Sequence, residues 1–219
     1  EDYVKSLNIA STHDHILFFT DLGRVHHRKG YQIPEAGRTA RGTAIVNVLP
    51  LDPGEAVTAM VITREFHENE YLMMVTQKGT VKRIPFIALK TNRRGGIRAI
   101  TLDEGDHLIN VIRTRGEDNI LIATAQGMAI CFSENDARPM GRDAVGVRGI
   151  TLSEGDYVVG AEKAEEGKQL LTVTERGYGK RTELSEYLRT AADGTKTAQQ
   201  RGGKGLKNYN ITDKTGLVA

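Results

Sequence analysis

The sequence predicts an all-β fold, a propeller-like array of four-stranded blades in which each repeat of the chain forms one blade. Three observations predict it. Two different short elements recur along the chain, both with a period of about 50 residues. Each element places a Gly-containing turn between apolar runs, which is typical of hairpins. Helical periodicity is nearly absent, and four short strands per repeat are typical of blades that bury their faces against neighbours.

The first recurring element is an apolar run, two polar residues, a glycine and a second short run. It reads ILFFTDLGRV at 16–25, YLMMVTQKGTV at 71–81, ILIATAQGMAI at 120–130 and QLLTVTERGYG at 169–179. The turn glycines are Gly23, Gly79, Gly127 and Gly177, spaced 56, 48 and 50 residues apart. A tight turn needs a residue that tolerates positive φ, so each copy predicts a strand, a turn and a return strand.

The second element follows each copy of the first and centres on an acidic turn. It reads LPLDPGEAVTAM, ITLDEGDHLINV, ITLSEGDYVVGA and, less regularly, ITDKTGLVA. Its glycines are Gly54, Gly105, Gly155 and Gly216, spaced 51, 50 and 61 residues apart. We expect this element to form a second hairpin, which gives each repeat its four strands.

The repeats divide the chain into a single repeat domain, 1–219, which we expect to be a fragment of a longer array. EDYVKSL at the start matches GDYVVGA at 155–161, so residues 1–14 are expected to end a preceding blade. The four repeats then span 15–69, 70–118, 119–167 and 168–219, the last with an insertion. TELSEYLRTA at 182–191 is expected to be a loop or one short helix.

Composition narrows the class of protein only a little. The 219 residues carry a formal net charge of +2, which favours no particular partner. Cys131 is the one cysteine and lies in an apolar run, so we expect a buried thiol and a reducing, cytoplasmic compartment. No apolar run approaches the roughly 20 residues of a membrane span, and no membrane partner is expected.

Positive charge is concentrated in one half of the period. Net charge is +7 over residues 78–98, +4 over 23–42 and +5 over 176–207, whereas 127–148 are balanced. Acidic residues gather in the other half, as in 153–166. Because equivalent halves of the repeats face the same way in a radial array, the cations are expected to form a band on the rim, a track for a polyanion.

The last repeat contains about a dozen extra residues, and QQRGGKG at 199–205 lies within them. A glycine- and lysine-rich insertion can be a solvated loop. A second copy favours a function: NRRGGIR at 92–98 aligns with it, Arg94 over Arg201 and Gly95-Gly96 over Gly202-Gly203. Adjacent glycines let backbone N–H groups approach a phosphate that arginine and lysine neutralise. The absence of aromatic residues there disfavours stacking on single strands.

QQRGGKG resembles the Gln-Arg-Arg-Gly-Gly-Lys-Gly signature found in the C-terminal domain of the A-type subunit of bacterial DNA gyrase, and the repeats resemble that family over essentially the whole chain. The resemblance implies a β-pinwheel whose blades exchange strands, around whose rim duplex DNA wraps with a right-handed path. Such a wrap directs strand passage toward negative supercoiling. Gln200 replaces an arginine of the signature, and Asn92 and Ile97 make the other copy degenerate.

The resemblance also implies partners and a role for the parent enzyme. The partners are double-stranded DNA without sequence preference, the remainder of the gyrase A protein and the gyrase B protein, in the cytoplasm at the nucleoid. The chain is expected to be non-catalytic and to hold no cofactor, with ATP and Mg²⁺ acting elsewhere in an ATP-dependent type IIA topoisomerase. From the charge band and the signature together, the predicted DNA-binding residues are Gln199, Gln200, Arg201, Gly202, Gly203, Lys204, Gly205, Lys207, Lys180, Arg181, Lys82, Arg83, Arg93, Arg94, Arg98, Arg38, Arg41 and Arg148.

Three alternatives stay open at this point. The equivalent domain of the topoisomerase IV A-type subunit shares the fold and has degraded signatures. A protein-interaction propeller would use its flat faces, and an enzyme would need convergent polar side chains that the sequence does not show.

His13 and His15 could begin a metal site, but no third ligand cluster is near them in sequence, and we expect no metal. GGKG is not a phosphate-binding Walker loop, because Ala198 and Gly205 replace its required glycine and Ser or Thr.

Overall fold

The computed structural model describes residues 4–219, and its regular structure is all β apart from single 3-10 turns. The first three repeats each contain a long hairpin and a third long strand, β1 (His15–Thr20), β2 (Arg24–Lys29), β3 (Val57–Thr63), β4 (Tyr71–Thr76), β5 (Thr80–Pro85), β7 (Leu108–Thr114), β8 (Asn119–Thr124), β9 (Met128–Ser133) and β11 (Val158–Ala164). The fourth repeat begins with the hairpin of β12 (Gln169–Val173) and β13 (Gly179–Glu183). The predicted all-β fold is confirmed.

Three strands of only two residues complete the sheets: β6 (Ile97–Arg98), β10 (Val147–Arg148) and β16 (Leu206–Lys207). Each pairs with the hairpin of the preceding repeat. The sheet orders are β3-β1-β2-β6, β10-β5-β4-β7 and β11-β8-β9-β16, here called blades 1, 2 and 3. Blade 4 is the β12–β13 hairpin, joined by a bridge between Thr174 and Val218. We call β6, β10 and β16 the exchange strands.

The second hairpin predicted within each repeat is wrong as a local unit in the second and third repeats, because its two strands belong to different sheets. In the second repeat the turn at Gly105 connects β6, on blade 1, to β7, on blade 2. The third repeat divides β10 and β11 between blades 2 and 3 in the same way. Each exchange strand satisfies backbone groups that the outer edge of the preceding hairpin would otherwise leave unpaired. The exchange therefore ties successive blades together.

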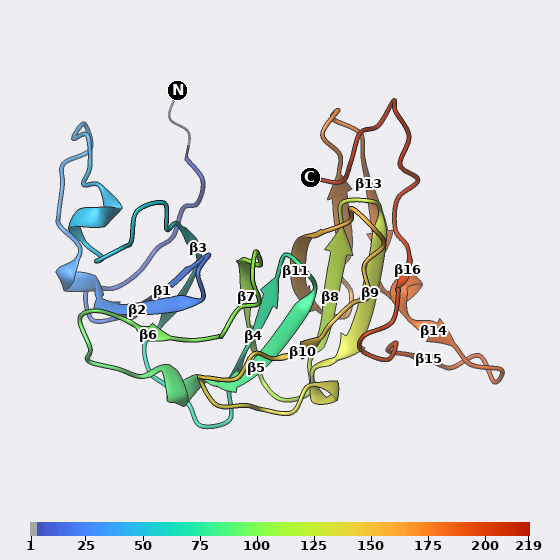
Figure 1. The fold of residues 1–219 in the computed structure, drawn as a ribbon, viewed down its shortest axis with the longest axis horizontal. Helices are drawn as coiled ribbons and strands as arrows, with labels where there is room; N and C mark the ends of the chain where they lie inside the picture. The colour runs from blue at the N-terminus through green and yellow to red at the C-terminus, as the bar shows by residue number, and fades with distance from the viewer. Residues whose placement is uncertain (1–3) are drawn as a thin grey trace.

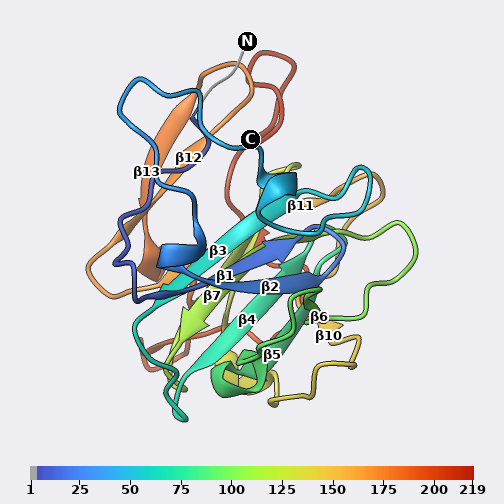
Figure 2. The same cartoon turned by 90° about the vertical axis from the view of Figure 1, so that its left-hand side faces the viewer.

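The blades follow one another along an open arc, with blade 1 at one end and blade 4 at the other (Figure 1). Seen from the side of blade 1, its sheet stands in front of blade 2 and their strands cross (Figure 2). β7 contacts both β3 and β11, so these three strands form the inner edges of their sheets. The exchange strands occupy the opposite edges and therefore lie on the outer rim.

Most of the hydrophobic core lies between blades rather than inside one. Leu17 and Phe19 of β1 pack with Leu72 and Met74 of β4 in one cluster. The residue between these two on β4, Met73, packs instead in the cluster between blades 2 and 3. Successive strand residues point to opposite faces, so a hairpin covered on both faces reads as a continuous apolar run. Each such buried side chain contributes roughly 1.5–3 kcal/mol relative to exposure.

Cys131 lies in a third cluster with Leu121 and Tyr187, as its apolar surroundings in the sequence predict. Burial raises the pKa of the Cys131 thiol to about 11, so the thiol is protonated at neutral pH.

The remaining segments connect or extend the blades. The 3-10 turns are η1 (Gly30–Gln32), η2 (Ile45–Asn47), η3 (Phe86–Leu89), η4 (Glu134–Asp136) and η5 (Leu184–Tyr187). η5 is the short helix that 182–191 predicted. The insertion of the fourth repeat forms an extra hairpin, β14 (Arg189–Thr190) with β15 (Lys196–Thr197), around Asp193 and Gly194.

Residues 4–10 form no strand, and residues 1–3 of the predicted preceding blade lie outside the described residues. Nowhere in residues 4–219 is there a helix of the length and hydropathy that crossing a bilayer requires.

Candidate nucleic-acid interface

The three exchange strands carry a cation at the same place. In blade 1 Arg98 lies opposite Arg24, in blade 2 Arg148 lies opposite Thr80, and in blade 3 Lys207 lies opposite Met128. In each pair the partner is the first residue after the turn glycine of the hairpin. Arg98, Arg148 and Lys207 are exposed, and we call them the rim cations.

The same backbone bonds hold all three exchange strands. The carbonyl of the turn glycine Gly23 accepts the N–H groups of Ala99 and Ile100 at 2.8 and 3.2 Å. Corresponding pairs of bonds, of 2.7 to 3.3 Å, run from Gly149 and Ile150 to Gly79, and from Asn208 and Tyr209 to Gly127. Since each rim cation directly precedes such a pair, the three cations occupy equivalent positions on the outer rim.

A glycine at the start of each exchange strand permits its close approach to the hairpin. A Cβ added at Gly205 would lie 2.4 Å from the carbonyl oxygen of Ala129, and one at Gly146 would lie 2.5 Å from that of Val81. Gly96, Gly146 and Gly205 also have positive φ, of 76°, 107° and 79°. Glycine adopts this conformation without steric cost, so Gly, an apolar residue and a cation form the repeated unit of the rim.

This register corrects the alignment of the two glycine-rich copies by two residues. Gly96 corresponds to Gly205 and not to Gly203, because both stand one residue before an exchange strand. The counterpart of Arg201 is therefore Asn92.

A third copy, Gly146-Val147-Arg148, was not identified from the sequence. The signal was available: Gly96 and Gly146 both precede the acidic-turn glycine of their repeat by nine residues.

The predicted signature residues divide into anchors and exposed groups. Gln199 is buried and donates from its backbone to Cys131 O at 2.7 Å and from Nε2 to Tyr187 O at 2.8 Å. Arg201 donates through Nε to Asp136 O at 2.9 Å and through Nη1 to Arg148 O at 2.5 Å. The N–H of Gly202 donates to Gly149 O at 2.8 Å. The expectation that this glycine offers its N–H to a phosphate is therefore wrong. Gln200, Gly203, Lys204 and Lys207 are exposed.

Lys82 and Arg83, predicted on the rim, are buried in β5. Lys82 Nζ donates to Ala99 O at 2.8 Å and to Arg142 O at 2.6 Å, and burial lowers the pKa of Lys82 to about 8. Lys82 thereby links β5 to the segment that contains Ala99 and to the segment that contains Arg142. Both side chains are at most 4% exposed, and their donors are directed into the fold. Neither is available to a phosphate.

Arg83 belongs to an ion pair between blades 2 and 3. Its Nη2 lies 2.9 Å from Glu134 Oε1, and its guanidinium lies 4.0 Å from the ring centroid of Tyr71. The other oxygen of Glu134 accepts the N–H groups of Gly116 and Asp118 at 3.1 and 2.8 Å. The pair joins the two blades and is structural.

The other predicted cations are exposed. Arg93 and Arg94 lie just before β6, and Arg38 and Arg41 lie on the loop before η2. Lys180 and Arg181 on β13 hold the same positions after the turn glycine as the buried Lys82 and Arg83, yet they are exposed, with the Lys180 ammonium 5.3 Å from the ring centroid of Tyr209. Blade 4 has no exchange strand over β13 within the described residues, so these two side chains face outward.

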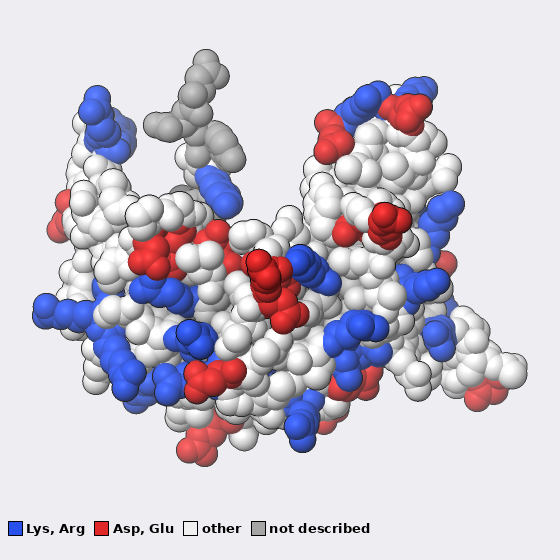
Figure 3. All heavy atoms as spheres, viewed as in Figure 1, with Lys and Arg blue, Asp and Glu red and all other residues white. Residues whose placement is uncertain are grey.

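The rim is continuous because each exchange segment contacts the one before it. The Oγ1 of Thr101 donates to Asp143 O at 3.0 Å, and the Oγ1 of Thr151 donates to Gly202 O at 2.7 Å. Lysine and arginine side chains gather along the lower left and lower edge of the arc, with acidic groups interspersed (Figure 3). Exposed cations at spaced positions can contact the phosphates of a polyanion.

The site is thus the outer edge of a propeller-type repeat domain that presents one cation per exchange strand. A family model described as DNA gyrase C-terminal domain, beta-propeller, matches residues 14–64, 70–115, 118–165 and 168–219. The chain belongs to the DNA gyrase C-terminal domain family.

The curated relatives agree with this membership, and the solved structures agree with the fold. The chain is 47% identical over 218 residues to the gyrase A protein of Clostridium acetobutylicum, covering 100% of this chain and 25% of that protein. It is 42% identical to that of Escherichia coli K12, covering 100% and 24%. The chain therefore spans about a quarter of the length of these relatives. The C-terminal domain of DNA topoisomerase IV superposes with a TM-score of 0.83 at 25% identity, covering 94% of this chain and 62% of that one. The DNA gyrase A C-terminal domain superposes with 0.73 at 23%, covering 95% and 65%.

Proposed function

We propose that this chain is a non-catalytic domain that binds duplex DNA along the outer rim and wraps it, and that the wrap directs strand passage toward negative supercoiling in a gyrase. The single observation that carries the proposal is the equivalence of Arg98, Arg148 and Lys207 in three successive blades. Cations at one position of a regular array can neutralise phosphates at regular intervals along a curved duplex.

The energetics of wrapping are compatible with such contacts. Bending 20–30 bp by 40–90° costs on the order of 1–6 kcal/mol, and each blade must offset part of this cost. Exposed neighbours such as Lys204, Arg93 and Arg94 add to the rim cations. All of these are backbone-directed charges, so we expect weak sequence preference and a steep dependence of affinity on salt.

The remaining roles follow from family membership. In the parent enzyme we propose two partners, the remainder of the gyrase A protein and the gyrase B protein, in the cytoplasm at the nucleoid. ATP and Mg²⁺ are proposed to act in other parts of an ATP-dependent type IIA topoisomerase, and this chain is proposed to need neither.

A topoisomerase IV A-type subunit is the second candidate, because that C-terminal domain has the higher TM-score of the two structures, 0.83 against 0.73. Sequence identity of 42–47% over the whole chain to gyrase A proteins supports gyrase. The two candidates differ in whether binding changes the topology of a closed circle.

The triple variant Arg98→Ala/Arg148→Ala/Lys207→Ala is expected to bind a 40-bp duplex at least tenfold more weakly at about 0.1 M salt. If each cation releases one counterion, the slope of log K against log salt falls by roughly 2.7, at 0.9 per phosphate. Fluorescence anisotropy across a salt series measures both quantities.

The matched control removes three cations that the fold places in the acidic half, Arg64, Lys163 and Lys168. Each lies within 4 Å of a carboxylate, Asp14 or Glu165. The control triple variant is expected to keep the affinity within about twofold and the slope within one unit. Equal losses in the two triple variants would contradict the proposed rim and reduce DNA binding to an effect of net charge.

A further inference from the structure

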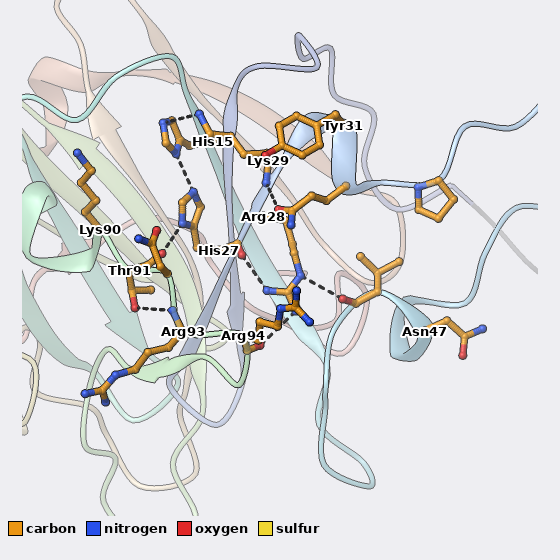
Figure 4. A pocket seen from close by; sticks show the side chains of 14 residues that line it. His15, His27, Arg28, Lys29, Tyr31, Asn47, Lys90, Thr91, Arg93 and Arg94 are labelled. Carbon is orange, nitrogen blue, oxygen red and sulfur yellow. Dashed lines mark hydrogen bonds between the residues drawn. The ribbon is translucent and has the colours of Figure 1, made fainter.

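A cavity of about 530 Å³ lies beside blade 1, between β2, the turns η1 and η2, and the segment 90–94 that leads to β6. Figure 4 shows its lining. Five of the lining residues are cations and two are histidines, His15 and His27, and no aspartate or glutamate is among them. The cations are Arg28, Lys29, Lys90, Arg93 and Arg94. A concave site with positive charge on several sides selects an anion with several charges close together.

A hydrogen-bonded chain of side chains fixes one wall of the cavity. Lys29 Nζ lies 2.9 Å from His15 Nε2, His15 Nδ1 lies 2.7 Å from His27 Nε2, and His27 Nδ1 lies 2.6 Å from Thr91 O. A carbonyl only accepts, so His27 donates to Thr91. In a neutral imidazole one nitrogen donates and the other accepts. His27 Nε2 therefore accepts from His15 Nδ1, and His15 Nε2 accepts from Lys29 Nζ.

This arrangement requires the His15 imidazole to be neutral, and its surroundings favour that state. Burial lowers the pKa of His15, and the charge of Lys29 lowers it further. The rings of His15 and His27 stack with centroids 4.9 Å apart. Lys29 Nζ also donates to His13 O at 3.1 Å, so its ammonium is fixed at the cavity by an imidazole and a carbonyl rather than by a carboxylate.

A second cation is fixed at the cavity by backbone carbonyls. Arg28 donates through Nε to Val48 O at 3.2 Å, through Nη1 to His27 O at 2.8 Å and through Nη2 to Arg94 O at 3.2 Å. These carbonyls orient the guanidinium but bring no negative charge. Burial and the nearby Arg94 lower the pKa of Arg28, which is the mark of a positive charge that lacks a counter-charge.

The donors on the third side are free. In residues 4–219 the side chains of Lys90, Arg93 and Arg94 make no hydrogen bond or ion pair. The N–H groups of Asn92, Arg94 and Gly95 likewise have no acceptor in the described chain. Free guanidinium, ammonium and backbone donors around a fixed pair of cations form an anion site.

We infer that this cavity binds a small ligand with adjacent phosphate groups, the phosphoanhydride chain of inorganic polyphosphate or of a nucleoside triphosphate. The five cations match the roughly four or five negative charges that a triphosphate chain carries at neutral pH. A duplex presents singly charged phosphates on a convex surface and does not fill a concave cavity. This binding does not depend on the proposed DNA path, although Arg93 and Arg94 belong to both.

The test is isothermal titration calorimetry of the whole chain with sodium tripolyphosphate at constant ionic strength. We expect one site per chain. Arg93→Ala/Arg94→Ala is expected to weaken binding at least tenfold, because both side chains are exposed donors at the cavity and each charge-assisted contact is strong. The matched control, Arg38→Ala/Arg41→Ala, removes the same charge from an exposed loop that does not line the cavity and is expected to leave binding unchanged.

ATP and AMP identify the source of the phosphate chain. Binding of ATP but not of AMP supports a nucleotide ligand, and binding of tripolyphosphate without ATP supports inorganic polyphosphate. Equal weakening in the two double variants would overturn the site. Loss of duplex affinity in Arg93→Ala/Arg94→Ala without any tripolyphosphate binding would also overturn it, and would leave the proposed DNA path intact.

Discussion

A Gly205→Ala variant is expected to release β16 from blade 3 and to lose about 2–4 kcal/mol of stability. The added Cβ meets the carbonyl oxygen of Ala129 at 2.4 Å, and the residue must keep a φ of 79°. The contact is with backbone, which cannot rotate aside as a side chain can. Moving the strand away breaks its pairing with β9 and the bonds of Asn208 and Tyr209 to Gly127.

Urea unfolding and amide hydrogen exchange measure this effect. We expect faster exchange at residues 206–209, with little change in the protection of blades 1 and 2, since repeat arrays are held by nearest-neighbour contacts. Gly54→Ala is the matched control, because Gly54 has a φ of 80° but no atom within 4 Å of an added Cβ. It isolates the cost of the backbone conformation, about 1 kcal/mol. Equal losses in the two variants would mean that the close approach of the exchange strand contributes nothing.

A Glu134→Ala variant is expected to lose about 3–5 kcal/mol, the cost of leaving one member of a buried ion pair without its partner. Glu134 is 0% exposed, and its two oxygens accept from Arg83, Thr114, Gly116 and Asp118. The substitution leaves the buried Arg83 guanidinium without a counter-charge and the N–H groups of Gly116 and Asp118 without an acceptor. Because the pair joins blades 2 and 3, the whole unfolding transition is expected to shift.

Thermal and urea unfolding compare this variant with Glu165→Ala. Glu165 pairs with Lys163 and Lys168 at the surface, where its side chain is 39% exposed, and an exposed pair contributes about 0–1 kcal/mol. A Glu134→Ala variant no less stable than Glu165→Ala would show that the inter-blade pair is not a stabilising contact.

The sequence was sufficient for the features that depend on local chemistry. The four turn glycines have φ between 78° and 86°, as tight hairpin turns require, and the hairpins pair around them as predicted. Strand exchange was implied by the resemblance alone, since nothing in a two-residue strand such as Val147–Arg148 distinguishes pairing within a repeat from pairing with a neighbour.

The errors concern contacts supplied by another repeat. Lys82 and Arg83 were assigned to the rim because they are cations in a basic segment, but residues 134 and 142 of the next repeat contact them, together with residue 99 of their own repeat. Alignment of the turn glycines indicates the difference: Lys82 stands where the third repeat has Ile130, and Arg83 where it has Cys131. Both of those residues are buried, so the two positions face the interior in the second and third repeats, whereas in the first repeat His26 is buried and His27 is half-buried.

The anion cavity was likewise beyond local patterns. His15, Arg28 and Arg94 come from separate segments of two repeats, and their convergence depends on how the second repeat crosses blade 1. His15 was weighed as half of a metal-binding pair with His13 and as an ordinary strand residue, and no metal was expected. In the structure its two nitrogens contact His27 and Lys29, which is a structural use of the ring.

Sealing a nicked circular plasmid with ligase in the presence of increasing amounts of this protein tests the proposed wrapping most directly. We expect a positive change in linking number that grows with protein concentration, disappears at high salt and is lost in Arg98→Ala/Arg148→Ala/Lys207→Ala. Tight, salt-sensitive binding of the circle with no change in linking number would contradict the proposal that the rim wraps DNA.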